Sequence, residues 1–463
     1  MTTVALINPG TQSWASIHPP FNLGYLAAFL EKNGVKCHII DELAGQNVAK
    51  MLKQIKPDIV GITATTVVAP SAYRAVRIAK EMGILTVMGG VHASILSDEA
   101  LNNGADIVVI GEGEQAMLDI VNGRRDRIIK NDFVKNIDDL PTPPWRLMDM
   151  DFYLATKDRV PRSHINLPIP PGTKIGALIT SRGCPYQCIF CYNSWRNTPL
   201  RFNSAERVIA DIENLIKDYG IKALFFIDDN LLANKQRLKT ICEAMIRKNM
   251  NLIWGCQATA NYVDVETLKM MKEAGCRQIC FGFESGSQKI LDILKKKSQA
   301  IGQNKRAVDV CNEAGMPFSA TFMIGNPEET IGDIKETFNF IRDNKLKKAS
   351  ILIATPFPGT ELWAWCKSKK LIPDKVDWAK FSTGEISIPC NDTIPPKVIQ
   401  KLRDEIQNYF EPMSLKEILF YLPKRPDIIL RALKNPKAAL SFVFKKKTNI
   451  ELTTDEMFER MLK

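Results

Sequence analysis

The sequence lacks the marks of a membrane-spanning or secreted protein. None of its apolar runs approaches the roughly 18 consecutive residues that a membrane span needs. Its first residues, MTTVALINPG, do not show the basic segment followed by an apolar segment that is typical of a signal peptide. We therefore expect a cytoplasmic protein.

Nor does the sequence have the cysteine content of a small disulfide-bonded protein, because its 463 residues contain only 11 cysteines. In a reducing compartment, clustered thiols typically bind a metal or take part in chemistry. Eight of the cysteines are scattered, and we expect these to serve as small buried apolar side chains. The exception is the group formed by Cys184, Cys188 and Cys191.

The overall composition is that of a globular protein. Hydrophobic residues make up 45% of the chain and charged residues 24%, which is close to the average for soluble proteins. A chain of this length exceeds what one compact core usually holds, so we expect two or three domains. The formal net charge of +11 is compatible with nucleic acid, an anionic membrane surface or an acidic ligand.

Residues 1–123 alternate short apolar runs with amphipathic stretches. This rhythm of five strands and intervening helices predicts a doubly wound, Rossmann-like α/β domain, whose ligand binds beyond the carboxyl ends of parallel strands. The periodicity fades over residues 124–172, where the proline-rich pieces LPTPPW and LPIPPG indicate a linker.

The alternation resumes over residues 173–395, with six units of strand and helix. These units predict a partial (β/α)6 barrel of the TIM type, in which the active site lies at the carboxyl ends of the strands. The three clustered cysteines directly follow the first of these strands. Residues 396–463 continue without a strand pattern and predict a basic, helical C-terminal region.

The stretch SRGCPYQCIFCYN, residues 181–193, has the cysteine spacing C-x3-C-x2-C. A structural zinc site needs four protein ligands, usually in two separated pairs, and this loop contains no fourth cysteine or histidine. A [4Fe-4S] cluster has four irons, so three thiolates leave one iron without a protein ligand. That open iron can hold a substrate or a cofactor, which favours a cluster over zinc.

With this loop the sequence resembles the radical S-adenosylmethionine (radical SAM) superfamily, whose signature is C-x3-C-x2-C after the first barrel strand. The resemblance implies that S-adenosylmethionine chelates the open iron and is cleaved reductively to a 5'-deoxyadenosyl radical. It also implies an electron donor of the flavodoxin or ferredoxin type.

Other positions match the family one at a time. Phe190, before the third cysteine, resembles the aromatic residue that packs by the adenine, with Tyr192 adjacent; ordinary loop packing is the alternative. FFIDDN ends the second barrel strand, where the family places polar groups for the methionine amino group. Asp228 and Asp229 are therefore candidates, although one of them could instead cap the next helix.

Two later strand ends also resemble the family. Glu284 in FGFESGS follows an apolar strand, and a carboxylate there resembles the ribose or amino-acid contact. A buried acid without a partner is costly, which favours a ligand role for it. MIGNPEET, after the fifth strand, resembles the glycine-containing adenine loop at Gly325 and Asn326.

Within this superfamily, a doubly wound domain before the barrel resembles the cobalamin-binding subgroup. The matching turns are GITATT, GGVHAS and GEGEQ, where glycines let a large ligand approach the backbone closely. The residues that this resemblance assigns to cofactor binding are Thr63, Thr65, Gly89, Gly90, His92, Gly111 and Glu112.

One feature of many cobalamin domains is missing. Domains that ligate cobalt through histidine carry D-x-H-x-x-G after the first strand, whereas this chain reads NPGTQSWASIHPP. His18 is present without that spacing, so the resemblance implies cobalamin without a histidine on cobalt. His92 then resembles a contact near the nucleotide tail, with a structural turn role as the alternative. The methylthiotransferases share the layout but carry three more N-terminal cysteines, whereas residues 1–170 hold only Cys37.

The C-terminal region mixes apolar stripes such as ILFYL and ALSFVF with lysine and arginine. A segment of this kind can lie on the inner face of an anionic membrane, or pack its apolar face on the barrel with its lysines in water. Nucleic acid is a third partner, but the sequence contains no recognisable RNA-binding module to favour it.

These observations lead to one principal hypothesis and two alternatives. The first is a cobalamin-dependent radical SAM methyltransferase acting on an unactivated carbon of a hydrophobic or lipid-like substrate. The second keeps both cofactors but ends in oxidation, cyclisation or rearrangement. The third is a non-catalytic cobalamin or iron-sulfur sensor. The subgroup includes enzymes that act on hopanoids, porphyrin rings, antibiotics and peptides, so the sequence leaves the substrate open.

Overall fold

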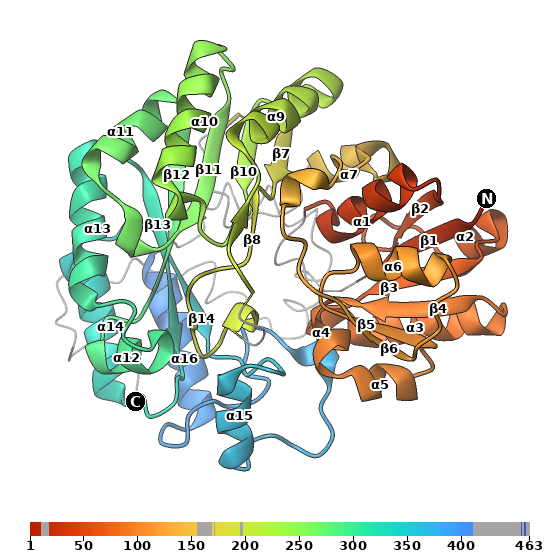
Figure 1. The fold of residues 1–463 in the computed structure, drawn as a ribbon. Coiled ribbons are helices and arrows are strands. Elements are labelled where there is room, and N and C mark those ends of the chain that lie inside the picture. Colours follow the sequence, from red (N-terminus) through yellow and green to blue (C-terminus); the bar gives the residue numbers. More distant parts are fainter. Residues whose placement is uncertain are drawn as a thin grey trace.

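The computed structural model describes residues 1–10, 18–154, 169–170, 172–194 and 198–410, together with residues 455, 458 and 459. Figure 1 shows a smaller α/β domain, formed by the N-terminal part of the chain, beside an open arc of strands lined on its outside by helices. None of the helices in these described ranges combines the length and apolar character that crossing a bilayer requires.

The N-terminal domain is built on a six-stranded parallel sheet of order β2-β1-β3-β4-β5-β6. Its strands are β1 (Thr3–Asn8), β2 (Lys36–Asp41), β3 (Ile59–Thr63), β4 (Leu85–Gly89), β5 (Ile107–Ile110) and β6 (Ile128–Lys130). Its helices are α1 (Phe21–Lys32), α2 (Val48–Ile55), η1 (Thr66–Val68), α3 (Ala69–Glu81), α4 (Gly90–Ile95), α5 (Ser97–Asn102) and α6 (Glu114–Val121). The doubly wound fold predicted from the sequence is confirmed.

One strand of this sheet lies in the segment that the sequence indicated as a linker. β6 pairs in parallel with β5, with Ile129 buried against the sheet. It has three residues and follows the charged run RRDR, so it shows no strand periodicity of its own. The same segment then forms η2 (Ile137–Asp139), η3 (Trp145–Leu147) and α7 (Met150–Leu154).

The second sheet contains six parallel strands in the order β14-β13-β12-β11-β10-β7, so neighbours in sequence are neighbours in space. The strands are β7 (Ile175–Leu178), β10 (Ala223–Phe226), β11 (Ile253–Ala258), β12 (Cys276–Glu284), β13 (Phe318–Ile324) and β14 (Ala349–Ile353). Between the first two of them, β8 (Ser181–Arg182) and β9 (Arg201–Phe202) form a short antiparallel ribbon. The partial barrel predicted from the sequence is confirmed.

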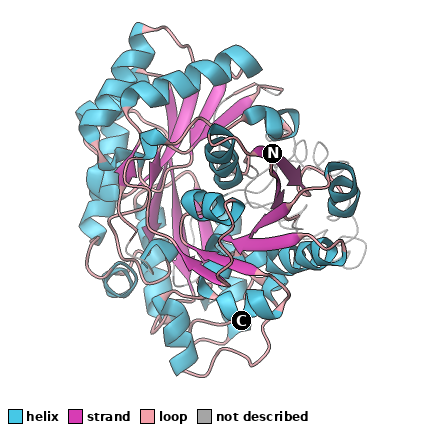
Figure 2. Cartoon of the chain, turned by 45° about the vertical axis from the view of Figure 1, so that its right-hand side comes forward, coloured by secondary structure: helices cyan, strands magenta, loops and turns pink. Residues whose placement is uncertain are grey.

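Helices line the outer side of this arc, as Figure 2 shows. They are α9 (Ala205–Tyr219), α10 (Lys235–Arg247), α11 (Val265–Glu273), α12 (Gln288–Lys295), α13 (Ile301–Ala314), α14 (Ile331–Asp343) and α16 (Pro396–Phe410). Helix α15 (Glu361–Ser368) lies below the arc in Figure 1. Short 3-10 turns are η4 (Tyr192–Ser194), η5 (Leu231–Ala233), η6 (Ala260–Tyr262) and η7 (Trp378–Lys380).

Helix α9 illustrates why the sequence folds in this way. The Ser204 hydroxyl accepts a hydrogen bond from the Arg207 amide at 3.2 Å and caps the helix, and Gly220 ends it in the left-handed region at φ +66°. Val208, Ile212 and Leu215 recur at helical spacing and are buried. Burying one such side chain contributes about 1.5–3 kcal/mol.

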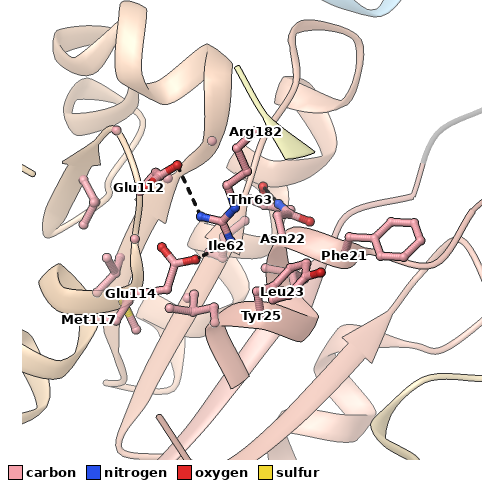
Figure 3. Close-up of a pocket in the computed structure, with 18 of the residues that line it drawn as sticks. Phe21, Asn22, Leu23, Tyr25, Ile62, Thr63, Glu112, Glu114, Met117 and Arg182 are labelled. Carbon is pink, nitrogen blue, oxygen red and sulfur yellow. Dashed lines mark hydrogen bonds and ion pairs between the residues drawn. The ribbon is translucent and has the colours of Figure 1, made fainter. Parts of the chain in front are cut away.

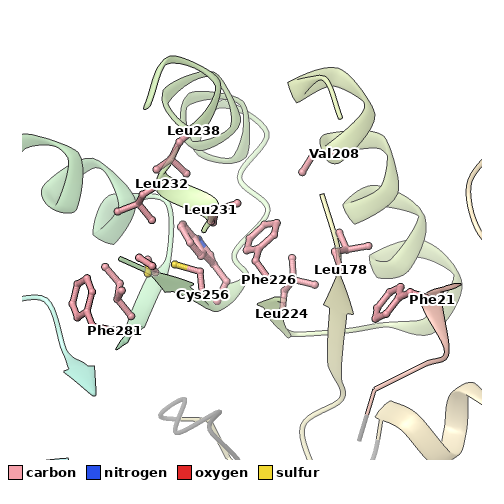
Figure 4. Packing of buried hydrophobic residues seen from close by; sticks show 14 of the residues in the cluster. Phe21, Leu178, Val208, Leu224, Phe226, Leu231, Leu232, Leu238, Cys256 and Phe281 are labelled. Carbon is pink, nitrogen blue, oxygen red and sulfur yellow. The ribbon is translucent and has the colours of Figure 1, made fainter. Parts of the chain in front are cut away.

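The hydrophobic core of the barrel continues into the N-terminal domain. Figure 4 shows the side chains of α9 and α10 above the strands, with Phe21 of α1 at the margin beyond Leu178. The Tyr25 hydroxyl donates to the carbonyl oxygen of Ile179, just after β7, at 3.3 Å. A second junction joins η7 to the N-terminal domain, because the Trp378 indole donates to Glu99 at 2.8 Å.

Much of the predicted basic tail lies outside the described residues. Helix α16 buries Ile399, Leu402 and Ile406 and packs beside β14. Near the end of the chain, Phe458 is fully buried and contacts the ring of Phe338 on α14 at 6.1 Å between centroids. The apolar stripes expected over residues 412–447 fall in a segment that the structure does not describe.

Candidate active site

The cysteine loop begins at a glycine that no other residue could replace without strain. Gly183 has φ +87°, and a Cβ atom at this position would lie 2.3 Å from the carbonyl oxygen of Pro199. Both facts exclude an ordinary side chain, because L-residues rarely adopt this φ and atoms cannot approach so closely. The turn therefore sends the chain from β8 sharply into the loop that carries Cys184.

Backbone hydrogen bonds hold the middle of this loop to two helices. The amide of Ile189 donates to the carbonyl oxygen of Leu294 in α12 at 3.0 Å, and the amide of Leu362 in α15 donates to Ile189 at 2.9 Å. Within the loop, the amide of Cys191 donates to Cys188 at 3.1 Å. The positions of Cys188 and Cys191 are thus fixed by the barrel.

The three thiols lie in a partly buried environment. Burial raises the pKa of Cys184 and Cys188, and raises that of Cys191 to about 12. The described residues contain no group of three or more His, Cys, Asp or Glu side chains close enough to share a metal ion. The donor set nevertheless fits an iron-sulfur cluster, because three thiols on one loop match its ligand chemistry and a bound cation would favour the thiolate forms. The thiols would have to turn toward one another.

A buried lysine beside these cysteines was not identified from the sequence. Lys295 Nζ lies 2.9 Å from Glu284 Oε1, and both side chains are almost buried. Burial lowers the pKa of Lys295, but the negative charges of Glu284 and Cys188 outweigh it, and the pKa is raised. Lys295 follows Leu291 by one helical turn, and this spacing is the signal that could have placed it on the buried face.

Glu284, a predicted cofactor contact, is the last residue of β12 and has an unusual backbone. Its φ is +61°, in the left-handed region, and the register with β13 shifts at this point. A non-glycine residue held there costs about 1–3 kcal/mol and persists only where the surroundings impose it. Such strain at the carboxyl end of a barrel strand is a common property of functional sites.

The two aspartates after β10 lie in different environments. Asp228 is buried, and its Oδ1 atom accepts hydrogen bonds from the Thr180 amide at 3.0 Å and from the hydroxyl groups of Thr180 and Ser181. It therefore anchors the chain just before the cysteine loop, and burial raises its pKa. Asp229 is exposed and accepts from the Asn193 side chain at 2.6 Å, so it faces the end of the loop.

The aromatic residues of the loop lie beside the same buried lysine. Phe190 is partly buried, and Lys295 Nζ lies 5.4 Å from the centre of its ring. Tyr192 begins η4 directly after Cys191. The structure thus brings Phe190 close to Cys188 and Glu284, while the expected adenine contact stays a prediction.

Gly325 and Asn326 form a buried turn after β13. Both backbone amides donate to Glu329 Oε2, at 2.6 and 3.0 Å, and Asn391 covers the turn by donating to the carbonyl oxygen of Asn326. Burial raises the pKa of Glu329 to about 7. The turn is set by these internal bonds, so the predicted adenine contact rests on the family resemblance.

A cavity of about 280 Å³ lies at the carboxyl edge of the N-terminal sheet. Figure 3 shows its walls, formed by α1, by the turns after β3, β4 and β5, and by Arg182 from the start of the cysteine loop. The predicted contacts that line it are Thr63, Gly89, Gly90, Gly111 and Glu112. Asn22, Tyr25, Glu114 and Arg182 also line it, and these four were not identified from the sequence.

The glycines of this cavity leave space that a side chain would occupy. A Cβ atom on Gly89 would find no atom nearer than 4.0 Å, and one on Gly113 none nearer than 3.9 Å. At Gly90, by contrast, φ is +85° and a Cβ atom would lie 2.8 Å from the carbonyl oxygen of Ala64. The cavity is at the small end of ligand pockets, so it has room for only part of a molecule as large as cobalamin.

Thr65 and His92 lie away from the cavity lining. Thr65 is exposed at the start of η1. His92 is fully buried, where its Nε2 atom is 3.0 Å from the Tyr73 hydroxyl and its ring packs against Trp378 at 5.2 Å between centroids. The position of His92 is that of a structural residue at the junction with η7, and its predicted nucleotide contact gains no support from this geometry.

Residues 178–341 match the family model of the radical SAM superfamily, and residues 9–121 match that of the B12 binding domain. The chain is 31% identical over 452 residues to an uncharacterized methyltransferase of Pyrococcus horikoshii, covering 90% of this chain and 94% of the relative. It is 28% identical over 380 residues to the anaerobic magnesium-protoporphyrin IX monomethyl ester cyclase of Rubrivivax gelatinosus, covering 74% of this chain and 66% of the relative.

Among solved structures, the fold resembles the cobalamin-dependent S-adenosylmethionine radical enzyme OxsB with aqua-cobalamin and S-adenosylmethionine bound. The TM-score is 0.68 at 17% identity, over 100% of this chain and 80% of OxsB. This similarity confirms the order of the two domains and the α/β fold class predicted from the sequence.

Proposed function

Because the chain belongs to the cobalamin-binding radical SAM family of enzymes, we propose that it is a C-methyltransferase that acts on an unactivated carbon of a hydrophobic, lipid-like substrate. Its cofactors would be a [4Fe-4S] cluster on Cys184, Cys188 and Cys191, S-adenosylmethionine, and cobalamin. Family membership indicates an enzyme, so a non-catalytic sensor is not retained as an alternative.

The observation that carries the proposal is the contact between the two cofactor regions. Ile179 and Arg182, at the start of the cysteine loop, form part of the wall of the cavity in the N-terminal domain. Arg182 is two residues from Cys184, the first expected cluster ligand. A substrate at the carboxyl ends of the barrel strands would therefore lie between the two cofactors, as transfer between them requires.

The chain's own residues would bind and orient these groups. When bound, the cluster would supply an electron to the sulfonium of S-adenosylmethionine, and cobalamin would carry the methyl group. Cys184, Cys188 and Cys191 would bind the iron. Glu284 and Lys295 present one charge of each sign beside the loop, suited to the amino and carboxylate groups of a methionine moiety.

Aromatic side chains after β14 support a hydrophobic substrate. Trp378 packs against Trp363 at 5.9 Å and against Phe381 at 5.2 Å between ring centroids, and Phe381 packs against Phe357 at 5.8 Å. Except for Phe381 these rings are only partly buried. Segments after a barrel strand lie on the active-site side, so they offer an apolar wall to a substrate there.

The proposal is tested with S-adenosylmethionine that carries an isotopic label in its methyl group. The enzyme, reconstituted anaerobically with iron, sulfide and cobalamin, is reduced with dithionite and given lipid extracts from a deletion strain. Transfer of the label to a lipid product supports the proposal, and an unlabelled product contradicts methyl transfer. In that case oxidation or cyclisation is the alternative, which the similarity to a cyclase favours.

Cluster binding has its own experiment. Wild type and the triple variant in which Cys184, Cys188 and Cys191 are replaced by alanine are compared by iron content and electron paramagnetic resonance. The control variant Cys37→Ala changes a buried thiol of the N-terminal domain. We expect the signal in wild type and control, and its loss in the triple variant.

Two partners complete the proposal. An electron donor of the flavodoxin or ferredoxin type would supply the electron that dithionite supplies in the assay, and the net charge of +11 would favour a donor with an acidic surface. The basic C-terminal region would place the enzyme at the inner face of the membrane. Sedimentation with anionic vesicles, compared with neutral ones, measures this contact.

A further inference from the structure

Two like charges oppose each other at the base of the cysteine loop. β8 and β9 pair antiparallel, and their register sets Arg182 directly across from Arg201. Cations opposite each other on adjacent strands repel. Each strand of this ribbon has only two residues, so the pairing of the strands themselves offsets little of the repulsion. A negative charge between the two guanidinium groups would offset it.

Glu112 of the N-terminal domain supplies that charge. Its Oε1 atom lies 2.8 Å from Arg201 Nη2 and 3.3 Å from Arg182 Nη1. Its Oε2 atom accepts from Arg201 Nη1 at 3.0 Å and from the amide of Val134 at 2.6 Å. The side chains of Glu112, Arg182 and Arg201 are 15%, 19% and 9% exposed, so solvent screens them weakly.

Arg182 is also held by the cavity itself. Its Nη2 atom lies 2.8 Å from Glu114 Oε1, and its guanidinium lies 5.1 Å from the centre of the Tyr25 ring. Figure 3 shows Arg182 between the two glutamates, with dashed lines to both. The base of the cysteine loop is thus joined by charge to the wall of the cavity.

Glu112 lies between Gly111 and Gly113, which both line the cavity with their backbone. Gly111 has φ +102°, a conformation that favours glycine, and its amide donates to the Ser94 hydroxyl at 3.3 Å, while the Glu112 carbonyl oxygen accepts from the Asn131 side chain at 2.8 Å. A ligand in the cavity would contact this backbone and restrict it further. The side chain between the two glycines would then be held more firmly in the position that it has here.

We propose that Glu112 is a positioning residue that couples the cavity to the cysteine loop. Binding of cobalamin fixes the backbone from Gly111 to Gly113, which holds Glu112 between Arg182 and Arg201 and closes the ribbon from which Cys184 emerges. By linkage, assembly of the cluster strengthens cobalamin binding by the same factor. This inference rests on the proposed function and adds to it an order between the cofactors.

The first part of the proposal, that cobalamin binding orders the cysteine loop, is tested by hydrogen exchange of the full-length protein without its cluster. Amides of residues 183–194 are followed with and without hydroxocobalamin, with α10 as an internal reference. In wild type, cobalamin slows this exchange about tenfold, because charge-assisted contacts of this kind stabilise by at least that factor. In Glu112→Gln the slowing is lost, even at cobalamin concentrations that saturate binding.

Two further variants separate this coupling from general damage. Glu31→Gln removes another bidentate pair, in which Arg146 Nη2 lies 3.0 and 2.8 Å from the two oxygens of Glu31, and it leaves the slowing unchanged. Adding Arg201→Gln to Glu112→Gln removes the opposed charge. In the cobalamin-free protein, Glu112→Gln alone speeds the exchange of the loop, because Arg182 and Arg201 then repel each other. The added Arg201→Gln returns this exchange to the wild-type rate, while the response to cobalamin stays lost.

The second part of the proposal is that cluster assembly strengthens cobalamin binding. To test it, the affinity for hydroxocobalamin is measured by absorbance before and after cluster assembly. Assembly tightens binding in wild type and leaves it unchanged in Glu112→Gln. If wild type binds cobalamin but Glu112→Gln shows the same slowing and the same tightening, the inference is overturned and the proposed function stands. If wild type does not bind cobalamin, both are overturned.

Discussion

Removing Lys295 should lower the free energy of unfolding by several kcal/mol, because it would leave Glu284 buried without its counter-charge. The two groups are 2.9 Å apart, with side chains only 8% and 11% exposed. At an effective dielectric constant of about 20, this separation corresponds to about 6 kcal/mol of Coulomb attraction. Desolvation of both charges offsets part of it, and breaking a buried pair by removing one partner typically costs about 3–5 kcal/mol. We expect the free energy of unfolding of Lys295→Met to be lower than that of the wild type by that amount.

The assay is equilibrium unfolding in urea under anaerobic conditions, with the cluster absent. Because the pKa of Lys295 is raised, its contribution to the free energy of unfolding is fully present below the ordinary lysine pKa. The contribution is lost only as pH rises through the higher pKa of the folded protein, so pH 7 is suitable for the assay. Combining Lys295→Met with Glu284→Gln removes the unpaired charge and should recover much of the loss. A loss below about 1 kcal/mol, or a double variant no more stable than the single one, would refute this account of the pair.

Three further predictions concern the loop, the cavity and the buried turn. Gly183→Ala should lower the iron content after reconstitution by at least about tenfold, because its Cβ atom would meet the Pro199 carbonyl oxygen. The control Gly302→Ala, whose Cβ atom meets no atom within 4 Å, should leave the iron content unchanged. Equal losses in the two variants would contradict the reasoning. Gly89→Leu should weaken hydroxocobalamin binding about tenfold by filling the cavity without changing the cluster signal, whereas an unaltered affinity would place the ligand elsewhere. Between pH 5 and 8, the wild-type free energy of unfolding should fall by about 3 kcal/mol relative to that of Glu329→Gln. The folded pKa of Glu329, about 7, lies above the unfolded value, so the stability carried by the protonated form is lost as pH rises through this range. Parallel pH profiles of the two proteins would show that Glu329 does not titrate there.

The sheet architecture was predictable because its strands are short apolar runs between amphipathic helices. β6 was missed since three residues beside a charged run show no period. The cysteine motif was equally visible, because its three ligands lie within eight consecutive residues. Sequence spacing could not show that Glu112 meets Arg201, since 89 residues separate them and they belong to different domains.

Turn residues were predictable only as a group. Thr63 and Gly89 line the cavity, whereas Thr65 and His92, two or three positions further along, face water and the protein interior. A turn reverses the direction of the side chains within one or two residues, and the sequence does not say where. Lys295 shows a related limit, because its spacing from Leu291 could place it on the buried face of α12 but could not show that Glu284 supplies its counter-charge.

The N-terminal domain touches the barrel near both of its unpaired edges. Tyr25 of α1 contacts Ile179 after β7, and Glu99 contacts Trp378 after β14. Together the two domains therefore form a closed ring with two seams. An open sheet presents the unpaired backbone groups of its two outer strands, and a neighbouring domain at those edges protects them from pairing with another chain.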